Sequence, residues 1–89
     1  GKKRIFETKS GDNIDYFELV PGIYEIWTEK TLIGKIKKER QVAQQIDIYS
    51  KGNRELHLPQ YFAQIETNNI KNKSFNDIYE ALNWVYENK

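Results

Sequence analysis

Basic residues gather in one short segment, which carries the strongest chemical signal in the sequence. From Lys30 to Arg40 there are five cations and a single carboxylate, Glu39. The cations are Lys30, Lys35, Lys37, Lys38 and Arg40. A nucleic-acid surface needs such charge for phosphates, and it needs an aromatic ring on which a base can stack. With Trp27 as the nearest ring, the segment predicts a nucleic-acid-binding surface.

Catalytic chemistry finds little support in the sequence. There is no cysteine, and the single imidazole, His57, is expected opposite Asp47 on a β-hairpin rather than beside a serine or threonine. An exposed cross-strand pair is the simpler interpretation of that arrangement. Glycine-rich phosphate loops of the nucleotide-binding types are also absent from the sequence. We therefore expect no enzymatic activity and no cofactor.

A run of carboxylates lies between residues 12 and 29, without an intervening lysine or arginine. Its members are Asp12, Asp15, Glu18, Glu25 and Glu29. Oxygen ligands in this number can hold a hard cation, so a small metal-dependent hydrolase is a third hypothesis beside those developed below. The simpler interpretation is a solvated acidic edge that balances the basic segment, and we expect no metal.

Length and composition limit the class of protein. Eighty-nine residues, 38% of them hydrophobic and 13% aromatic, suffice for one core, so we expect a single domain over 1–89. The net charge of +1 favours no class of partner. No apolar stretch has the length of a membrane span, and no secretory leader is recognisable. These features predict a cysteine-free cytoplasmic protein without membrane contact.

The stretch from Ser74 to Tyr86 predicts a C-terminal helix, over 74–87, that follows a loop over 67–73. Ser74 and Asp77 have the spacing of a capping box. Apolar residues then recur on one helical face: Phe75, Ile78, Leu82 and Val85. A helix this short needs an apolar surface on which to pack. The preceding part of the chain must supply that surface.

Trp84 falls roughly opposite the centre of this apolar stripe. Tryptophan is enriched at the centres of protein interfaces. Its position predicts contact with a protein partner or a second copy of the chain. The alternative is a helix buried over a wider arc, with Trp84 folded over Ala81 or into the last loop.

Residues 3–66 predict a small antiparallel sheet. Its clearest hairpin pairs Ile23–Thr28 with Leu32–Lys38 across a three-residue loop. This register gives an apolar face, which we expect the helix to cover, with Tyr24, Ile26, Leu32, Gly34 and Ile36. Gly34 would leave space there for a large side chain. The outer face carries Ile23, Glu25, Trp27, Ile33, Lys35 and Lys37.

A second hairpin is predicted between Ala43–Ser50 and Arg54–Leu58, again across three residues. Its register places Ile46 opposite Leu58 and Asp47 opposite His57. Pro59 is expected to end the second of these strands. For Tyr61–Glu66, alternating side chains favour a strand, although the spacing also allows a helical turn.

These elements predict an α+β fold: five to six short antiparallel strands in a bent sheet or partial barrel, closed by one C-terminal amphipathic helix. The predicted function is a small non-enzymatic nucleic-acid-binding accessory module for DNA or RNA. Its predicted contact residues are Trp27, Ile33, Lys35, Lys37, Lys38 and Arg40. The alternative is a protein-interaction or inhibitor module, homodimeric or bound to another protein, that uses the acidic edge or Trp84.

Overall fold

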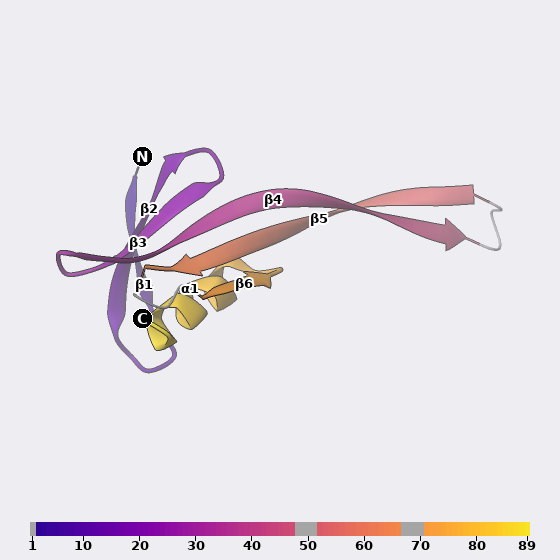
Figure 1. Ribbon diagram of the computed structural model, residues 1–89. Helices are drawn as coiled ribbons and strands as arrows, with labels where there is room; N and C mark the ends of the chain where they lie inside the picture. Colours follow the sequence, from indigo (N-terminus) through magenta and orange to yellow (C-terminus); the bar gives the residue numbers. More distant parts are fainter. Residues whose placement is uncertain (1, 48–51, 67–70) are drawn as a thin grey trace.

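Six strands form one antiparallel sheet in which neighbours in sequence are neighbours in space. The computed structural model describes residues 2–47, 52–66 and 71–89, and within these ranges the side chains outside 41–57. The elements are β1 (Lys3–Glu7), β2 (Asn13–Val20), β3 (Ile23–Thr28), β4 (Thr31–Asp47), β5 (Gly52–Ile65), β6 (Asn72–Phe75) and α1 (Ile78–Glu87). The sheet is bent but not closed into a barrel, and the single helix follows it (Figure 1). The predicted α+β fold is confirmed.

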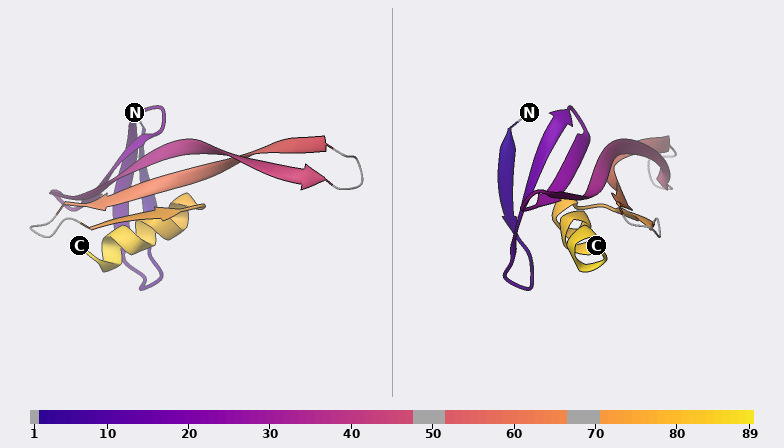
Figure 2. Two further views of the ribbon diagram at one scale, coloured as in Figure 1. Left: turned by 45° about the vertical axis from the view of Figure 1, so that its right-hand side comes forward. Right: turned by 60° about the vertical axis from the view of Figure 1, so that its left-hand side comes forward.

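Helix α1 lies on the inner side of the curled sheet (Figure 2). It packs against β4, β5 and β6, and Tyr79 of α1 stacks on Phe6 of β1 with ring centroids 5.5 Å apart. The largest fully buried side chains come from both layers: Ile14, Ile26, Ile36, Ile65, Leu82 and Val85. In the described part of the chain, no helix is long and apolar enough to cross a membrane.

The β3–β4 hairpin confirms most of the predicted register and corrects its loop. Four pairs are as predicted: Ile23 with Lys37, Tyr24 with Ile36, Glu25 with Lys35 and Ile26 with Gly34. The turn has two residues rather than three, and Glu29 takes a left-handed φ of 52°. Trp27 lies opposite Leu32, and a β-bulge at Ile33 restores the register. The predicted faces of Leu32 and Ile33 are both wrong: Leu32 shares the outer face with Trp27, whereas Ile33 is 5% exposed and belongs to the core.

Gly34 marks the closest approach of the helix to the sheet. A Cβ atom at this position would lie 2.6 Å from Cγ1 of Val85 and 2.7 Å from the carbonyl oxygen of Gln64. The predicted space at Gly34 is therefore present, and Val85 fills it.

The helix begins later than predicted because the preceding segment is a strand. Residues Asn72–Phe75 form β6 and pair with β5, so Ser74 is a strand residue and not a cap. Asp77 is the N-cap, and its side chain accepts a hydrogen bond from the backbone N–H of Tyr79 at 2.7 Å. The predicted stripe is otherwise kept, since Ile78, Leu82 and Val85 join the core from α1 while Phe75 reaches it from β6.

Strands β4 and β5 continue past the rest of the sheet as a two-stranded ribbon (Figure 1). Their pairing runs without a shift as far as Asp47 and Gly52, whereas β3 pairs no farther than Lys37 and β6 no farther than Tyr61. We call residues 38–47 and 52–60 the β-ribbon. The radius of gyration is 16.0 Å, against about 12 Å for a compact chain of this length. Two long strands thus replace several predicted short ones, and Tyr61–Ile65 is confirmed as strand.

The β-ribbon corrects the predicted register of the second hairpin. Asp47 lies opposite Gly52, and His57 lies opposite Val42, so Asp47 and His57 are not paired. The same shift places Ile46 opposite Asn53 instead of Leu58. Pro59 continues β5 instead of ending it. At this point β4 is the only strand described as paired with β5, so the N–H that proline lacks is not needed by a second neighbour. The predicted positions of residues 48–50 fall outside the described residues.

Candidate functional site

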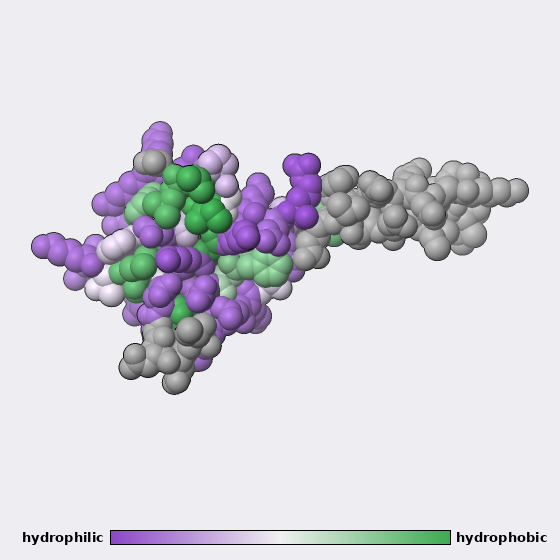
Figure 3. Space-filling model, turned by 45° about the horizontal axis from the view of Figure 1, so that its top comes forward, coloured by the Kyte–Doolittle hydropathy of each residue, from purple (hydrophilic) through white to green (hydrophobic). Residues whose placement is uncertain are grey.

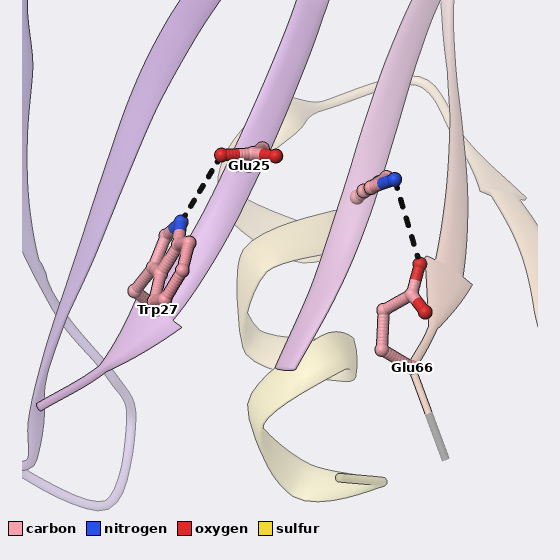
Figure 4. Close-up of polar contacts among 4 residues, drawn as sticks. Glu25, Trp27 and Glu66 are labelled. Atoms are coloured by element: carbon pink, nitrogen blue, oxygen red, sulfur yellow. Dashed lines mark hydrogen bonds and ion pairs between the residues drawn. The ribbon is translucent and has the colours of Figure 1, made fainter. Parts of the chain in front are cut away.

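Trp27 lies on the outer face of the sheet, with α1 behind it (Figure 4). Its ring is half-buried, and its indole N–H donates a hydrogen bond to Oε1 of Glu25 at 3.3 Å. Asp15 of β2 lies directly opposite Trp27 and is paired with Lys3 at 3.4 Å. A base that stacked on Trp27 would bring its phosphates close to two carboxylates, which repel them.

The two outer-face lysines of the predicted site also have carboxylates beside them. Nζ of Lys35 lies 3.9 Å from Oε1 of Glu66, a contact drawn in Figure 4. Nζ of Lys37 lies 3.1 Å from Oε1 of Glu39. Pairs as exposed as these add little to stability, but they place negative charge next to each lysine. The outer face is therefore of mixed charge and not a basic surface.

Lys38 and Arg40, the other predicted cations, project from the opposite face of β4. Strand alternation separates them from Lys35 and Lys37. Nζ of Lys38 lies 5.8 Å from the centroid of the Tyr61 ring on β5, within the range of a cation–π contact. The predicted site is thus divided between two faces, and these two cations share the face of the sheet on which α1 packs.

A pocket of about 180 Å³ lies on this face, between the sheet and the start of α1. Its lining includes four tyrosine rings, two cations and one carboxylate: Tyr16, Tyr24, Tyr61, Tyr79, Lys2, Arg4 and Glu18. We call it the tyrosine pocket. The sheet register assembles it, because Arg4 lies opposite Tyr16, and Glu18 opposite Tyr24. Strand β5 and helix α1 supply the remaining two rings.

Hydrogen bonds and burial determine the charge of Glu18 and Tyr24 in the pocket. The backbone N–H of Gly22 donates to Oε2 of Glu18 at 3.0 Å. This bond lowers the pKa of Glu18, and a hydrogen bond from Tyr24 and the charges of Arg4 and Lys38 lower it further. Burial, followed by the contact with Glu18, raises the pKa of Tyr24 to about 12. At neutral pH the carboxylate is therefore charged and the phenol is neutral.

Four cations belong to this side of the sheet: Lys2 and Arg4 line the tyrosine pocket, Lys38 lies over the Tyr61 ring, and Arg40 follows Lys38 on the same face of β4. Among side chains that the structure describes, no carboxylate lies within 4.0 Å of a charged nitrogen of Lys2, Arg4, Lys38 or Arg40. Glu18 is the one carboxylate in the pocket lining. We call these four cations and the pocket the tyrosine–basic surface. Its charge and its rings are what a phosphate-bearing ligand requires.

The acidic edge and Trp84, predicted as protein contacts, also have partners within the chain. Asp12 accepts hydrogen bonds from the hydroxyl of Tyr86 at 2.7 Å and from that of Ser10 at 3.1 Å, and both bonds lower its pKa. The half-buried ring of Trp84 packs against Phe75, with centroids 5.8 Å apart. The wider-arc alternative therefore describes α1 better, and the partner-binding role of Trp84 stays a prediction. Within the described ranges, no three His, Cys, Asp or Glu side chains are grouped to hold a metal.

Sequence reasoning missed the tyrosine pocket because its lining comes from five separate elements. Lys2 and Arg4 precede the basic segment by more than twenty residues, and Tyr79 follows it at a still greater distance. The sequence offers two signals: the basic residues Lys2, Lys3 and Arg4, which would extend the basic segment if the first strand lay near it, and the abundance of tyrosine, six residues in 89. Comparison of the chain with models of protein families, curated proteins and solved structures found no match.

Proposed function

We propose that the protein is a small nucleic-acid-binding module that contacts its ligand through the tyrosine–basic surface. The observation that carries the proposal is the charge at the tyrosine pocket: Lys2 and Arg4 line it with one carboxylate, Lys38 lies over the Tyr61 ring, and Arg40 follows on the same face of β4. Neutralised phosphates release counterions, which favours binding, and aromatic rings offer faces on which bases stack. Tyr79 is 53% exposed and is the most accessible ring described. The proposed role is binding without catalysis.

The choice between the two faces of β4 has a matched experiment. Replacing Lys38 and Arg40 with glutamate should weaken binding to a labelled oligonucleotide at low salt by about tenfold or more. The slope of log K against log salt should decrease by about one for each phosphate that the protein no longer neutralises. The pair Lys35→Glu and Lys37→Glu makes the same change in net charge on the outer face and should weaken binding much less. Fluorescence anisotropy with single-stranded and duplex oligonucleotides measures both.

If the Lys35→Glu and Lys37→Glu variant loses more affinity than the other pair, the binding site lies on the outer face, which carries Trp27. Equal losses would mean that only net charge matters and that neither face is a specific contact surface. If the unmodified chain shows no binding at low salt, where electrostatic attraction is strongest, the nucleic-acid proposal is wrong.

The β-ribbon favours a second candidate function, self-association. A two-stranded hairpin is at best marginally stable alone in water. Beyond Lys37 and Tyr61, the outer edges of β4 and β5 have no neighbouring strand among the described residues. Such edges are templates for pairing with another chain. Apolar groups also stand at the surface of the adjoining globule (Figure 3), among them Ile5 and Val20.

Shortening the β-ribbon tests this candidate. Replacement of residues 41–58 with an Asn-Gly turn joins Arg40 to Pro59 and keeps the part of the sheet that packs on α1. If ribbons mediate dimerisation, light scattering should show a mass that rises with concentration for the full chain and a constant monomer for the shortened one. A monomeric full chain at every concentration would exclude self-association through the ribbon.

A further inference from the structure

We propose that the tyrosine pocket is a binding site for a phosphate monoester, such as a nucleotide phosphate or the 5′ end of a nucleic acid. A phosphate monoester carries about −1.5 to −2 charges near pH 7, whereas an internal phosphodiester carries one. The proposal adds the chemical group that the tyrosine–basic surface selects. It rests on the proposed function only where the monoester belongs to a nucleic-acid end.

The pocket is large enough to admit a phosphate group. Its volume is about 180 Å³, many times the roughly 10–15 Å³ that a cavity needs to hold one water molecule. A terminal phosphate has one substituent that must leave the pocket, whereas an internal one has two. A phosphate held inside the pocket is therefore more easily a chain end, with the rest of the ligand outside.

The charges of the pocket favour an anion over a cation. Lys2 and Arg4 belong to the lining, and Lys38 adds a third positive charge over the Tyr61 ring. The planar guanidinium of arginine matches phosphate oxygens in pairs. Tyr16 contributes to the lining and is 7% exposed, so water is partly excluded there. Ionic hydrogen bonds are stronger in such surroundings than at an open surface.

Glu18 makes the sign of the ligand charge testable. Its carboxylate stays ionised through its hydrogen bonds and lies in the same pocket, so it repels a phosphate and would attract an ammonium group. Removing it should tighten phosphate binding, whereas removing Arg4 should weaken it. A cation held among the tyrosine rings, the arrangement known from aromatic cages, would respond in the opposite way to both changes.

The experiment is an NMR titration of the ¹⁵N-labelled full chain with adenosine 5′-monophosphate, with adenosine and tetramethylammonium as matched probes. The monophosphate should shift the amide signals of Tyr24, Tyr61 and Tyr79 saturably, and neither matched probe should do so. Arg4→Gln should weaken its binding by about tenfold or more, and Glu18→Gln should strengthen it severalfold. Lys9→Gln, which removes an exposed charge on the β1–β2 turn, should change nothing.

Two further comparisons test the pocket with a variant that does not disturb folding, and separate the pocket assignment from the proposed function. Lys2 is exposed and precedes β1, so Lys2→Gln leaves the fold intact and should still weaken binding of the monophosphate. Oligonucleotides of one sequence, with a 5′-phosphate or a 5′-hydroxyl, are then compared. Tighter binding of the phosphorylated end supports both proposals.

The remaining outcomes separate the two proposals. Equal binding of both oligonucleotides, with no response to the monophosphate, overturns the pocket assignment and leaves the proposed function standing. Binding of the monophosphate by a chain that binds neither oligonucleotide supports the pocket and overturns the proposed function. Equal responses to adenosine and its monophosphate, or opposite signs for the Arg4 and Glu18 variants, also overturn the assignment.

Discussion

Truncation of Leu82 to alanine is expected to lower the free energy of unfolding by about 2–5 kcal/mol. Leu82 is 0% exposed and belongs to the core cluster between α1 and the sheet. The helix has ten residues, too few to be stable alone, so its packing against the sheet must hold it. Urea unfolding followed by circular dichroism gives the free energy, because a domain of this size should unfold in one step.

Leu19 provides a matched control within the same chain. It is the same residue type, but it lies on β2 with 44% of its surface exposed. Leu19→Ala should cost about 1 kcal/mol or less, since the side chain is already largely in water. Similar losses for the two variants would contradict the assignment of the buried face of α1. A large change in the urea slope would instead indicate that the unfolding is not two-state.

The elements that repeat with a clear period were predictable from the sequence. Ile78, Leu82 and Val85 recur at the helical spacing, and the alternation of Tyr24 and Ile26 set four correct pairs between β3 and β4. The start of α1 was not predictable in the same way. Ser74 has a cap-like local signal, but its segment pairs with β5 as β6. That pairing depends on a distant strand, which local spacing does not reveal.

The extra residue at Ile33 shows a different limit. A two-residue turn would have moved every later side chain to the wrong face, so a three-residue loop was the natural inference from the pattern. The structure reaches the same register by combining the shorter turn with a bulge. Both solutions give the same pairs away from the turn, but they exchange the faces of Leu32 and Ile33. Hydrophobic pattern alone does not distinguish them.

The proposed binding surface can be predicted only in part from the sequence. The sequence shows the basic segment but not its division: a strand that continues to Asp47 places Lys38 and Arg40 on one face and Lys35 and Lys37 on the other. A strand that ends at Lys38, as the sequence predicts, assigns Arg40 to neither face. The rest of the surface needs the order of all six strands, which brings Arg4 near the start of α1.

Replacement of Gly34 with alanine should have the second large effect, a loss of about 1–3 kcal/mol or more through overpacking. In an ordinary strand this change is favourable, because alanine loses less conformational freedom than glycine on folding. Here the added Cβ would lie 2.6 Å from Cγ1 of Val85 and 2.7 Å from the carbonyl oxygen of Gln64. The Val85 side chain can move, but the Gln64 carbonyl belongs to a paired strand. Urea unfolding of the single variant gives the sign.

A double-mutant cycle with Val85→Ala separates the two contacts at Gly34. Val85→Ala removes the methyl group nearest the new Cβ and leaves the carbonyl of Gln64 in place. The double variant should therefore lose less stability than the sum of the two single changes, with a coupling of about 0.5–3 kcal/mol. Strict additivity would mean that the Gln64 carbonyl alone resists the new side chain. A neutral or stabilising Gly34→Ala would contradict the close approach of α1 to β4, on which the position of Tyr79 over the tyrosine pocket also depends.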